Sequence, residues 1–248
     1  MNQWLKVDVV NLKKWKNNLF TLIITAPINS FIAGQFTKLS YINSQKKRIQ
    51  RAYSFVNDPT NKNLEFYILL INKGKLTPKL YDIYNNKIFI KKNSFGFFTF
   101  SELPSKENVW MISTGTALGP YCSILQNENV LNKFKKIILI YAVKYSTDLN
   151  YLELFKKIKK KYKNKIKIKI ILSQEKNKKY LYGRITDLII SGELEKSTKE
   201  PLNKKKSHVM LCGNPNMIKD TQKILFSLKK MRKHFRRKPG HITSENYW

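Results

Sequence analysis

The 248-residue sequence predicts two successive domains, an antiparallel β-barrel over residues 1–100 and a doubly wound, parallel-sheet α/β domain over residues 101–248. Short β-like runs separated by turn residues fill the first part, whereas buried-type strands alternate with helix-like stretches in the second. Apolar residues make up 42% of the chain, which is enough for a hydrophobic core. No apolar run approaches the length of a membrane-spanning helix, so no membrane association is expected.

The predicted barrel consists of short runs, several of them rich in Val, Ile, Thr, Phe and Tyr. These runs are Leu5–Val10, Leu19–Ala26, Gln35–Ile42, Arg48–Val56, Leu64–Ile71, Lys87–Ile90 and Phe97–Phe100. Turn residues such as Asn57-Asp58-Pro59 separate some of them, and one short helix fits near Thr77–Ile83. Many short strands with turn signals are typical of a barrel or a sandwich.

The second part begins with the buried-type strand Val109–Ser113, which a helix-compatible stretch follows as far as Phe134. The apolar run Ile137–Val143 predicts the next strand, and Asp148 is the expected N-cap of the helix after it. Two more strands and an amphipathic helix complete the pattern: Ile166–Leu172, Val209–Cys212 and Met217–Met231. Alternating β and α units predict a parallel sheet, in which ligands bind at the carboxyl ends of the strands.

The net charge of +32 is extreme, with 48 Lys and Arg against 16 Asp and Glu. Such a surface is typical of nucleic-acid binding, because it releases counterions from phosphates. Lysine greatly outnumbers arginine, however, and the charge is spread along the chain together with abundant Asn and Ile. That pattern indicates a genome rich in A and T, so we expect no specific nucleic-acid function and keep it as an alternative.

The N-terminus has no long apolar stretch, and two cysteines, Cys122 and Cys212, are too few for a disulfide framework. The sequence therefore predicts a protein of the reducing cytoplasm. The three histidines show no metal-ligand spacing with these cysteines, so no metal site is expected.

The tetrapeptide Arg51-Ala52-Tyr53-Ser54 lies on a predicted barrel strand. Alternation sends Arg51 and Tyr53 to one side and Ala52 and Ser54 to the other. Arginine can hold a diphosphate by bidentate bonds, tyrosine can stack on a planar ring, and a serine hydroxyl can bond a ring nitrogen. The alternative is an ordinary strand with one exposed arginine.

Two further segments have the composition of phosphate or ligand contacts. Gly74-Lys75-Leu76-Thr77 precedes the short helix, where free backbone N–H groups bind phosphate, or it is simply a turn before a capped helix. Thr114–Pro120 joins a strand to a helix with only Gly115 and Gly119 of a glycine-rich fingerprint, so a plain turn is an equal interpretation.

Side chains that follow successive strands are expected to converge at one edge of the sheet. Cys212-Gly213 brings a thiol to this edge, where it can contact a nicotinamide ring or can simply be a buried cysteine. Lys144, Gln174 and Arg184 follow other strands, and two of these three are cations suited to a phosphate.

The end of the chain is basic and then aromatic. Arg232, Lys233, Arg236 and Arg237 fit an acidic protein partner, a nucleic acid or a solvated helix end. The terminal segment Glu245–Trp248 contains two aromatic rings that can cap a planar group.

Together these motifs resemble the bacterial ferredoxin/flavodoxin–NADP reductase family over residues 1 to 248. The resemblance implies a monomeric enzyme in which NADPH passes a hydride to N5 of FAD, and the flavin then gives single electrons to an acidic flavodoxin or ferredoxin. It implies a β-barrel FAD domain and an α/β NADP domain whose aromatic tail returns to the flavin. It assigns roles in the chemistry to Ser54, Cys212 and Glu245.

The resemblance also implies binding residues. The FAD contacts are Arg51, Ala52, Tyr53, Ser54, Tyr67, Lys75, Leu76, Thr77, Thr116, Tyr247 and Trp248. The NADP contacts are Val143, Lys144, Ser173, Gln174, Arg184, Cys212, Gly213, Asn214 and Pro215. Arg232, Lys233, Arg236 and Arg237 become the docking surface for the redox partner.

One departure concerns nicotinamide selectivity. Relatives carry arginines where Lys144 and Gln174 stand, and lysine lacks the planar fork while glutamine lacks the charge. These two positions leave the strength of the preference for NADPH over NADH open, whereas the class of cofactor is unaffected. A free-flavin or quinone reductase of the same fold remains the main alternative.

Overall fold

The computed structural model describes residues 3–127 and 132–247. Its backbone contacts define two compact units, Met1–Phe100 with Gly119–Asn127 and Ser101–Leu118 with Glu128–Trp248. The helix α2 (Gly119–Gln126) thus groups with the barrel strands rather than with the strands that flank it in the sequence. The assignment of two functional domains to residues 1–100 and 101–248 stays a prediction.

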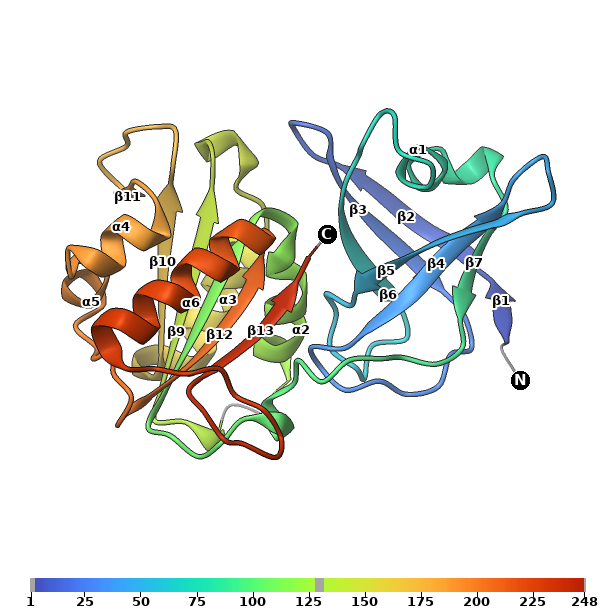
Figure 1. The fold of residues 1–248 in the computed structure, drawn as a ribbon. Coiled ribbons are helices and arrows are strands. Elements are labelled where there is room, and N and C mark those ends of the chain that lie inside the picture. The colour runs from blue at the N-terminus through green and yellow to red at the C-terminus, as the bar shows by residue number, and fades with distance from the viewer. Residues whose placement is uncertain (1–2, 128–131, 248) are drawn as a thin grey trace. The chain divides into compact units, whose positions relative to one another are not determined.

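The first unit consists of two antiparallel sheets around one apolar core (Figure 1). One sheet has the order β1 (Trp4–Lys6), β7 (Ile88–Lys91), β4 (Phe36–Ile42) and β5 (Arg48–Ser54). The other has the order β2 (Asp8–Lys14), β3 (Leu19–Thr25) and β6 (Leu64–Leu69). The short helix α1 (Thr77–Tyr81) packs Leu80 into the core. The predicted antiparallel β architecture is confirmed.

Two predicted strands of this part are wrong. Leu5–Val10 is not one strand, because the chain passes from β1 to β2 at Val7, whose buried side chain joins the core and whose N–H bonds to the carbonyl of Ile88 at 3.2 Å. Phe97–Phe100 forms no strand and leads into a 3-10 turn at Phe100–Glu102. Phe98 and Phe100 are buried, so their apolar character reflects packing rather than strand pairing.

The second unit contains a six-stranded parallel sheet in the order β11-β10-β9-β8-β12-β13. The strands are β8 (Asn108–Thr114), β9 (Lys136–Val143), β10 (Ile166–Leu172), β11 (Leu181–Tyr182), β12 (Ser207–Gly213) and β13 (Ile242–Asn246). After β8, the strands β9, β10 and β11 are added in sequence order on one side of β8. The chain then crosses to the other side of β8, where β12 and β13 lie. This reversal puts a topological switch point between β8 and β12, where ligands of open α/β sheets bind.

Helices cover both faces of this sheet (Figure 1). The helices α4 (Ile185–Ile190), α5 (Glu193–Thr198) and α6 (Pro215–Lys229) pack on one face, and α3 (Leu152–Tyr162) lies on the other. Alternation along the strands supplies both cores. Ile140 faces α4–α6, whereas the ring of Tyr141 meets Phe155 of α3 edge-on at 6.1 Å.

Two predicted helix limits differ from the structure. Asp148 does not cap α3, because its carboxylate accepts a bond from the N–H of Tyr145 at 3.1 Å, and the chain turns through Tyr151 at φ 63° before α3 begins. The helix α2 ends at Gln126, and residues 128–131, which the helix predicted as far as Phe134 would include, lie outside the described residues.

Candidate active site

The carboxyl edge of the parallel sheet brings together residues from several distant parts of the chain. At the switch point, the Thr114 hydroxyl at the end of β8 accepts a bond from the N–H of Asn214 at 3.1 Å. The Asn214 side chain in turn accepts from the N–H of Asn216 at 2.8 Å and caps α6, with Pro215 in its first turn. Thr114 belongs to the segment Thr114–Pro120 noted from sequence, but its bond to Asn214 was not predicted.

Gly213 permits the close approach of β8 and β12 at this point. It adopts φ +150°, and a Cβ placed on it would lie 2.1 Å from Oγ1 of Thr114. Only glycine therefore fits here without displacing the Thr114–Asn214 bond. The predicted Cys212-Gly213-Asn214 segment is thus part of a packed turn at the switch point.

Gly115, directly after the neighbouring strand β8, has free space around its backbone instead. It adopts φ +55°, and a Cβ placed on it would meet no atom within 4 Å. The backbone therefore borders open space, which is the property needed for a ligand to approach closely. Thr116, one residue later in the 3-10 turn Gly115–Leu118, is buried.

The C-terminal segment forms the strand β13 beside β12, which was not predicted. Glu245 pairs with Cys212, Asn246 pairs with Gly213, and the N–H of Tyr247 bonds to the Gly213 carbonyl at 3.0 Å. This pairing fixes Glu245 at the carboxyl edge of the sheet. Trp248, predicted to contact FAD, lies outside the described residues.

The surroundings of Glu245 and Cys212 shift the pKa values of both side chains. Burial raises the pKa of the Glu245 carboxyl to about 7. Burial, and secondarily the Glu245 carboxylate, raises the pKa of the Cys212 thiol well above its usual range. Cys212 is therefore a neutral thiol at physiological pH, whereas Glu245 changes its charge there.

The carboxyl ends of β9 and β10 are joined just beyond the sheet. The N–H of Ser173 bonds to the Val143 carbonyl at 2.9 Å, and the N–H of Gln174 bonds to the Lys144 carbonyl at 3.0 Å. The N–H of Gly183 bonds to Leu172, which brings the start of α4 to the same end of β10. The backbones of the predicted NADP residues of this region therefore gather at one edge.

The charges at this edge are mixed. Arg184 precedes α4 without a side-chain capping bond, and no ion pair engages Arg184 or Lys144 within the described part of the chain. Glu175 accepts a bond from the N–H of Ser146 at 2.7 Å, and this bond lowers the pKa of the Glu175 carboxyl. Sequence reasoning missed Glu175, although a carboxylate directly after Gln174 signals a second departure from a purely cationic phosphate site.

In the first unit, the predicted tetrapeptide lies on β5, an edge strand of its sheet. Cross-strand pairing places Arg51 opposite Leu39 and Tyr53 opposite Thr37, so Arg51 and Tyr53 share one face. Arg51 is exposed, and within residues 3–127 and 132–247 its guanidinium bonds only to the carbonyl of Gln50, at 2.7 Å. It has no carboxylate partner among the described residues, which leaves its charge available for an anion.

Arg48 on the same strand has a different environment. Its guanidinium lies 4.6 Å from the ring centroid of Trp4 and 5.0 Å from that of Phe89, and it donates to the Ser40 hydroxyl at 2.7 Å. Arg48 is therefore held by packing, whereas Arg51 is free to bind.

Tyr53 is half-buried, and Ser54 and Tyr67 are buried. Burial raises the pKa of the Tyr53 phenol above its usual range, and the charge of Arg51 opposes part of that shift. The phenol stays neutral at physiological pH, as a ring that stacks on an apolar planar group requires.

The predicted phosphate segment Lys75-Leu76-Thr77 forms a closed turn. The Thr77 hydroxyl accepts from the N–H of Ile71 at 3.0 Å and donates to its carbonyl at 3.2 Å. Leu76 is buried, and Lys75 is exposed. The hydroxyl of Thr77 thus holds the loop in place, and Lys75 carries the charge.

Some residues of the predicted docking surface near the C-terminus contact other side chains, and others are exposed without an ion pair. Arg236 forms a two-pronged ion pair with Glu102, and this pairing lowers the pKa of the Glu102 carboxyl. The ammonium group of Lys233 lies 5.4 Å from the ring centroid of Phe235. Arg232 and Arg237 are exposed and form no ion pair in the described part of the chain.

No group of three or more potential metal ligands is found in residues 3–127 and 132–247. Over the same residues, no helix is both long and apolar enough to cross a bilayer.

The fold and the sheet edge define the class of protein. An antiparallel β unit with a parallel α/β unit is the architecture of the flavin- and nicotinamide-dependent reductases, and residues 111–223 match the oxidoreductase NAD-binding domain family. The structure superposes with a TM-score of 0.90 on the crystal structure of a ferredoxin NADP+ reductase from Neisseria gonorrhoeae with bound FAD and NADP. That protein is 26% identical, and the match covers 99% of this chain and 98% of that chain.

Sequence comparison identifies the family more narrowly. The chain is 51% identical to a flavodoxin/ferredoxin–NADP reductase of Buchnera aphidicola subsp. Baizongia pistaciae, with 100% of both chains covered. It is 45% identical, again over 100% of both chains, to the flavodoxin/ferredoxin–NADP reductase of Escherichia coli. The chain therefore belongs to the flavodoxin/ferredoxin–NADP reductase family.

Proposed function

We propose that this chain is an FAD-containing enzyme that transfers electrons between NADPH and a flavodoxin or ferredoxin. The full-length similarity to flavodoxin/ferredoxin–NADP reductases carries this proposal. In the first unit, Arg51, which has no carboxylate partner among the described residues, lies on the same face as Tyr53 and suits FAD. In the second unit, the turn with Gly115 and Gly213 at the switch point suits NADPH.

The residues of the first unit fit FAD. Arg51 would hold the diphosphate through its planar fork, and the neutral ring of Tyr53 would stack on the isoalloxazine. The hydroxyl of Ser54 would bond a ring nitrogen, and Lys75 would add a positive charge near the phosphates. When bound, FAD supplies the hydride and single-electron chemistry that no side chain of the protein can perform.

The residues of the second unit fit NADPH. Gly115 leaves the backbone open at the switch point, and Gly213 keeps the neighbouring turn compact. The neutral thiol of Cys212 would lie against the nicotinamide without adding charge, while Lys144 and Arg184 would bind the phosphate of the nucleotide. Glu245, with a pKa of about 7, would hold or release a proton at its carboxyl near this ring.

The same proposal covers the setting in which the protein works. Arg232, Lys233 and Arg237 would attract an acidic redox protein, because oppositely charged surfaces accelerate encounter. Free Cys122 and Cys212 support a reducing cytoplasm. We propose that the chain acts as a monomer.

The function is tested by following NADPH oxidation with flavodoxin, with ferredoxin and with ferricyanide as the acceptor. We expect saturable turnover with flavodoxin or ferredoxin that falls as salt is added. Turnover with ferricyanide, free flavin or quinone but with neither protein would instead assign the chain to reductases of small acceptors.

A further inference from the structure

A groove of about 470 Å³ lies at the outer edge of the parallel sheet, between α3, β10 and the loop before β11. Five lysines line this edge groove, and no aspartate or glutamate among the described residues does. The lysines are Lys156, Lys159, Lys169, Lys178 and Lys179. The apolar side chains that line it are Leu152, Phe155, Ile168, Ile170 and Leu181.

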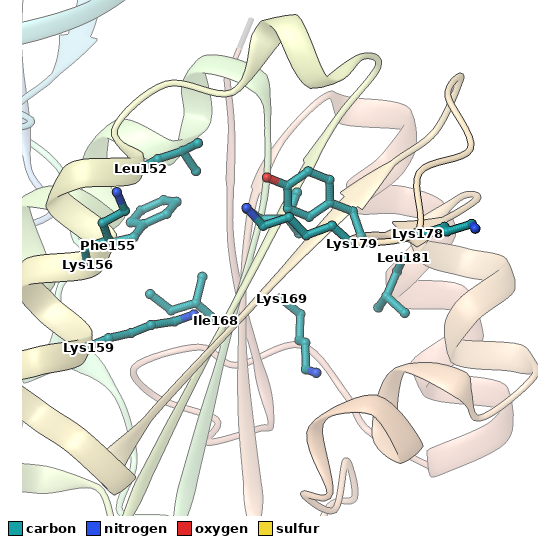
Figure 2. A pocket seen from close by; sticks show the side chains of 11 residues that line it. Leu152, Phe155, Lys156, Lys159, Ile168, Lys169, Lys178, Lys179 and Leu181 are labelled. Carbon is teal, nitrogen blue, oxygen red and sulfur yellow. The ribbon is translucent and has the colours of Figure 1, made fainter.

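Two of these lysines approach the groove from opposite sides (Figure 2). Lys159 extends from α3 toward Ile168, and Lys179 extends from the opposite loop toward α3. Lys159 forms no ion pair in the described part of the chain, and Lys179 lies 5.6 Å from the Tyr180 ring centroid. Lys156 is paired with the exposed Glu153 at 2.7 Å. The facing cations are therefore largely uncompensated.

The groove crosses an open strand edge. β11 pairs only with Ile171 and Leu172, so the preceding part of β10 has a strand neighbour, β9, on one side only. Three consecutive residues, 168 to 170, line the groove although successive side chains point to opposite faces of a sheet. A groove lined in this way runs along the edge of the sheet rather than over one face.

The direction of the backbone groups follows from the neighbouring bonds. The N–H of Ser173 points to β9, where it bonds to Val143, whereas the carbonyl of Leu172 points outward to Gly183. Since alternate residues of a strand point to alternate sides, the N–H and C=O groups of Ile168 also point outward. They face a position that no strand of the described chain fills.

We propose that the edge groove binds an acidic, extended peptide segment of a partner protein as an added strand on β10. Main-chain bonds to the outward groups of Ile168 would supply affinity, and apolar side chains of the segment would pack on Phe155 and Ile170. Carboxylates of the segment would pair with Lys159 and Lys179. None of the residues that line the groove is among the predicted NADP contacts.

Two features favour this occupant over others. A second copy of the chain is disfavoured, because each copy carries a net charge of +32 and edge lysines repel a like-charged strand. A compact anion would find flexible ammonium groups but no arginine fork in the groove. An extended acidic strand uses the charges, the apolar surface and the open backbone together.

The first test uses the full chain with FAD bound and a fluorescein-labelled peptide of alternating glutamate and valine. A matched peptide is N-methylated at alternate backbone nitrogens, which removes strand-pairing donors without changing charge. We expect the unmodified peptide to bind at least about tenfold more tightly, because main-chain bonds carry strand addition. Hydrogen exchange of the segment 166–170 should slow in its complex.

The second test compares two double variants that each lose two positive charges, one pair in the groove and one pair outside it. Lys159→Gln with Lys179→Gln should weaken peptide binding about tenfold, since both charges face the groove. Lys219→Gln with Lys223→Gln, at exposed positions on α6, should change it less than about twofold.

Equal weakening by both double variants would mean general attraction to a basic surface and would overturn the proposal. Equal binding of the N-methylated peptide would also overturn it. If the N-methylated peptide binds equally well and inorganic tripolyphosphate displaces it, the groove is a site for compact anions. Circular dichroism of each variant confirms that the fold is intact.

Discussion

Glu245 of β13 lies directly opposite Cys212 of β12 at the carboxyl edge of the parallel sheet. The pairing holds a carboxyl group in a half-buried position beside a buried thiol, and loss of solvent favours the neutral form of both groups. The C-terminal segment is thus an integral strand of the sheet up to Asn246.

The first prediction concerns the pH dependence of stability. The pKa of Glu245 is about 7 in the folded chain against a reference value of 4.5, so the folded state binds the proton more tightly than the unfolded state. Stability should therefore fall as pH rises from about 4.5 to 7, and the loss should be complete above 7. Glu245→Gln should remove this loss, which amounts to at most about 3 kcal/mol.

Thermal unfolding midpoints from pH 5 to 8 measure this effect, with the exposed Glu193→Gln as the control. Wild type and Glu245→Gln should converge at low pH and diverge toward neutral pH. Parallel curves across the range would show that the Glu245 carboxyl is not perturbed.

The second prediction compares two glycines with positive φ. Gly213→Ala places a Cβ against the Thr114 hydroxyl and should cost about 2–4 kcal/mol of unfolding free energy through overpacking and strain. Gly115→Ala meets no atom and should cost only about 1–2 kcal/mol from its backbone conformation. Urea unfolding measures both values, and equal costs would contradict the described packing at the switch point.

The third prediction separates two arginines of β5. Arg51→Lys should weaken FAD binding about tenfold or more, because lysine keeps the charge but loses the bidentate fork. Arg48→Lys should leave FAD affinity within about twofold and lower stability by about 1 kcal/mol, through loss of contact with Trp4 and Phe89. Fluorimetric FAD titration and urea unfolding distinguish them, and the reverse pattern would refute the assignment of Arg51.

The fourth prediction concerns selectivity for the nicotinamide cofactor. Gln174→Arg should raise the ratio of kcat/KM for NADPH to that for NADH about tenfold, because a charge-assisted bond to phosphate is added. Gln174→Lys should raise it less, since it adds charge without a fork, and Arg184→Gln should lower it. Steady-state kinetics with both nucleotides provide the measurement. No change in the ratio for any variant would remove these positions from the phosphate site.

The fifth prediction compares Arg236, which is paired with Glu102, with the exposed Arg237. Arg236→Gln should lower thermal stability, because it breaks the ion pair with Glu102. Arg237→Gln should leave stability unchanged and raise KM for flavodoxin at low salt, since this exposed charge is free to meet an acidic partner. If Arg237→Gln has no effect on KM at any ionic strength, these basic residues are not the docking surface.

The change from barrel to α/β architecture could be predicted from sequence because it rests on local patterns. Strongly apolar strands such as Ile137–Val143 alternate with helices, and their carboxyl ends must meet at one edge in a parallel sheet. The same reasoning placed the segments Cys212–Pro215 and Lys144 at that edge.

What could not be predicted depends on contacts distant in sequence. The strand Ile242–Asn246 has weak β character and forms because β12 offers it an edge. Asp148 has the signature of a helix cap, but its carboxylate is engaged by Tyr145 in the preceding turn. Thr114 and Glu175 acquire their roles from partners that only the folded chain brings near, Asn214 and Ser146.

The visible absorption spectrum of the purified full chain, recorded before and after anaerobic addition of NADPH, shows whether the chain binds FAD and accepts electrons from NADPH. We expect flavin bands that bleach on addition of NADPH and return when oxidised flavodoxin or ferredoxin is added. A colourless protein that also fails to bind added FAD would contradict this expectation.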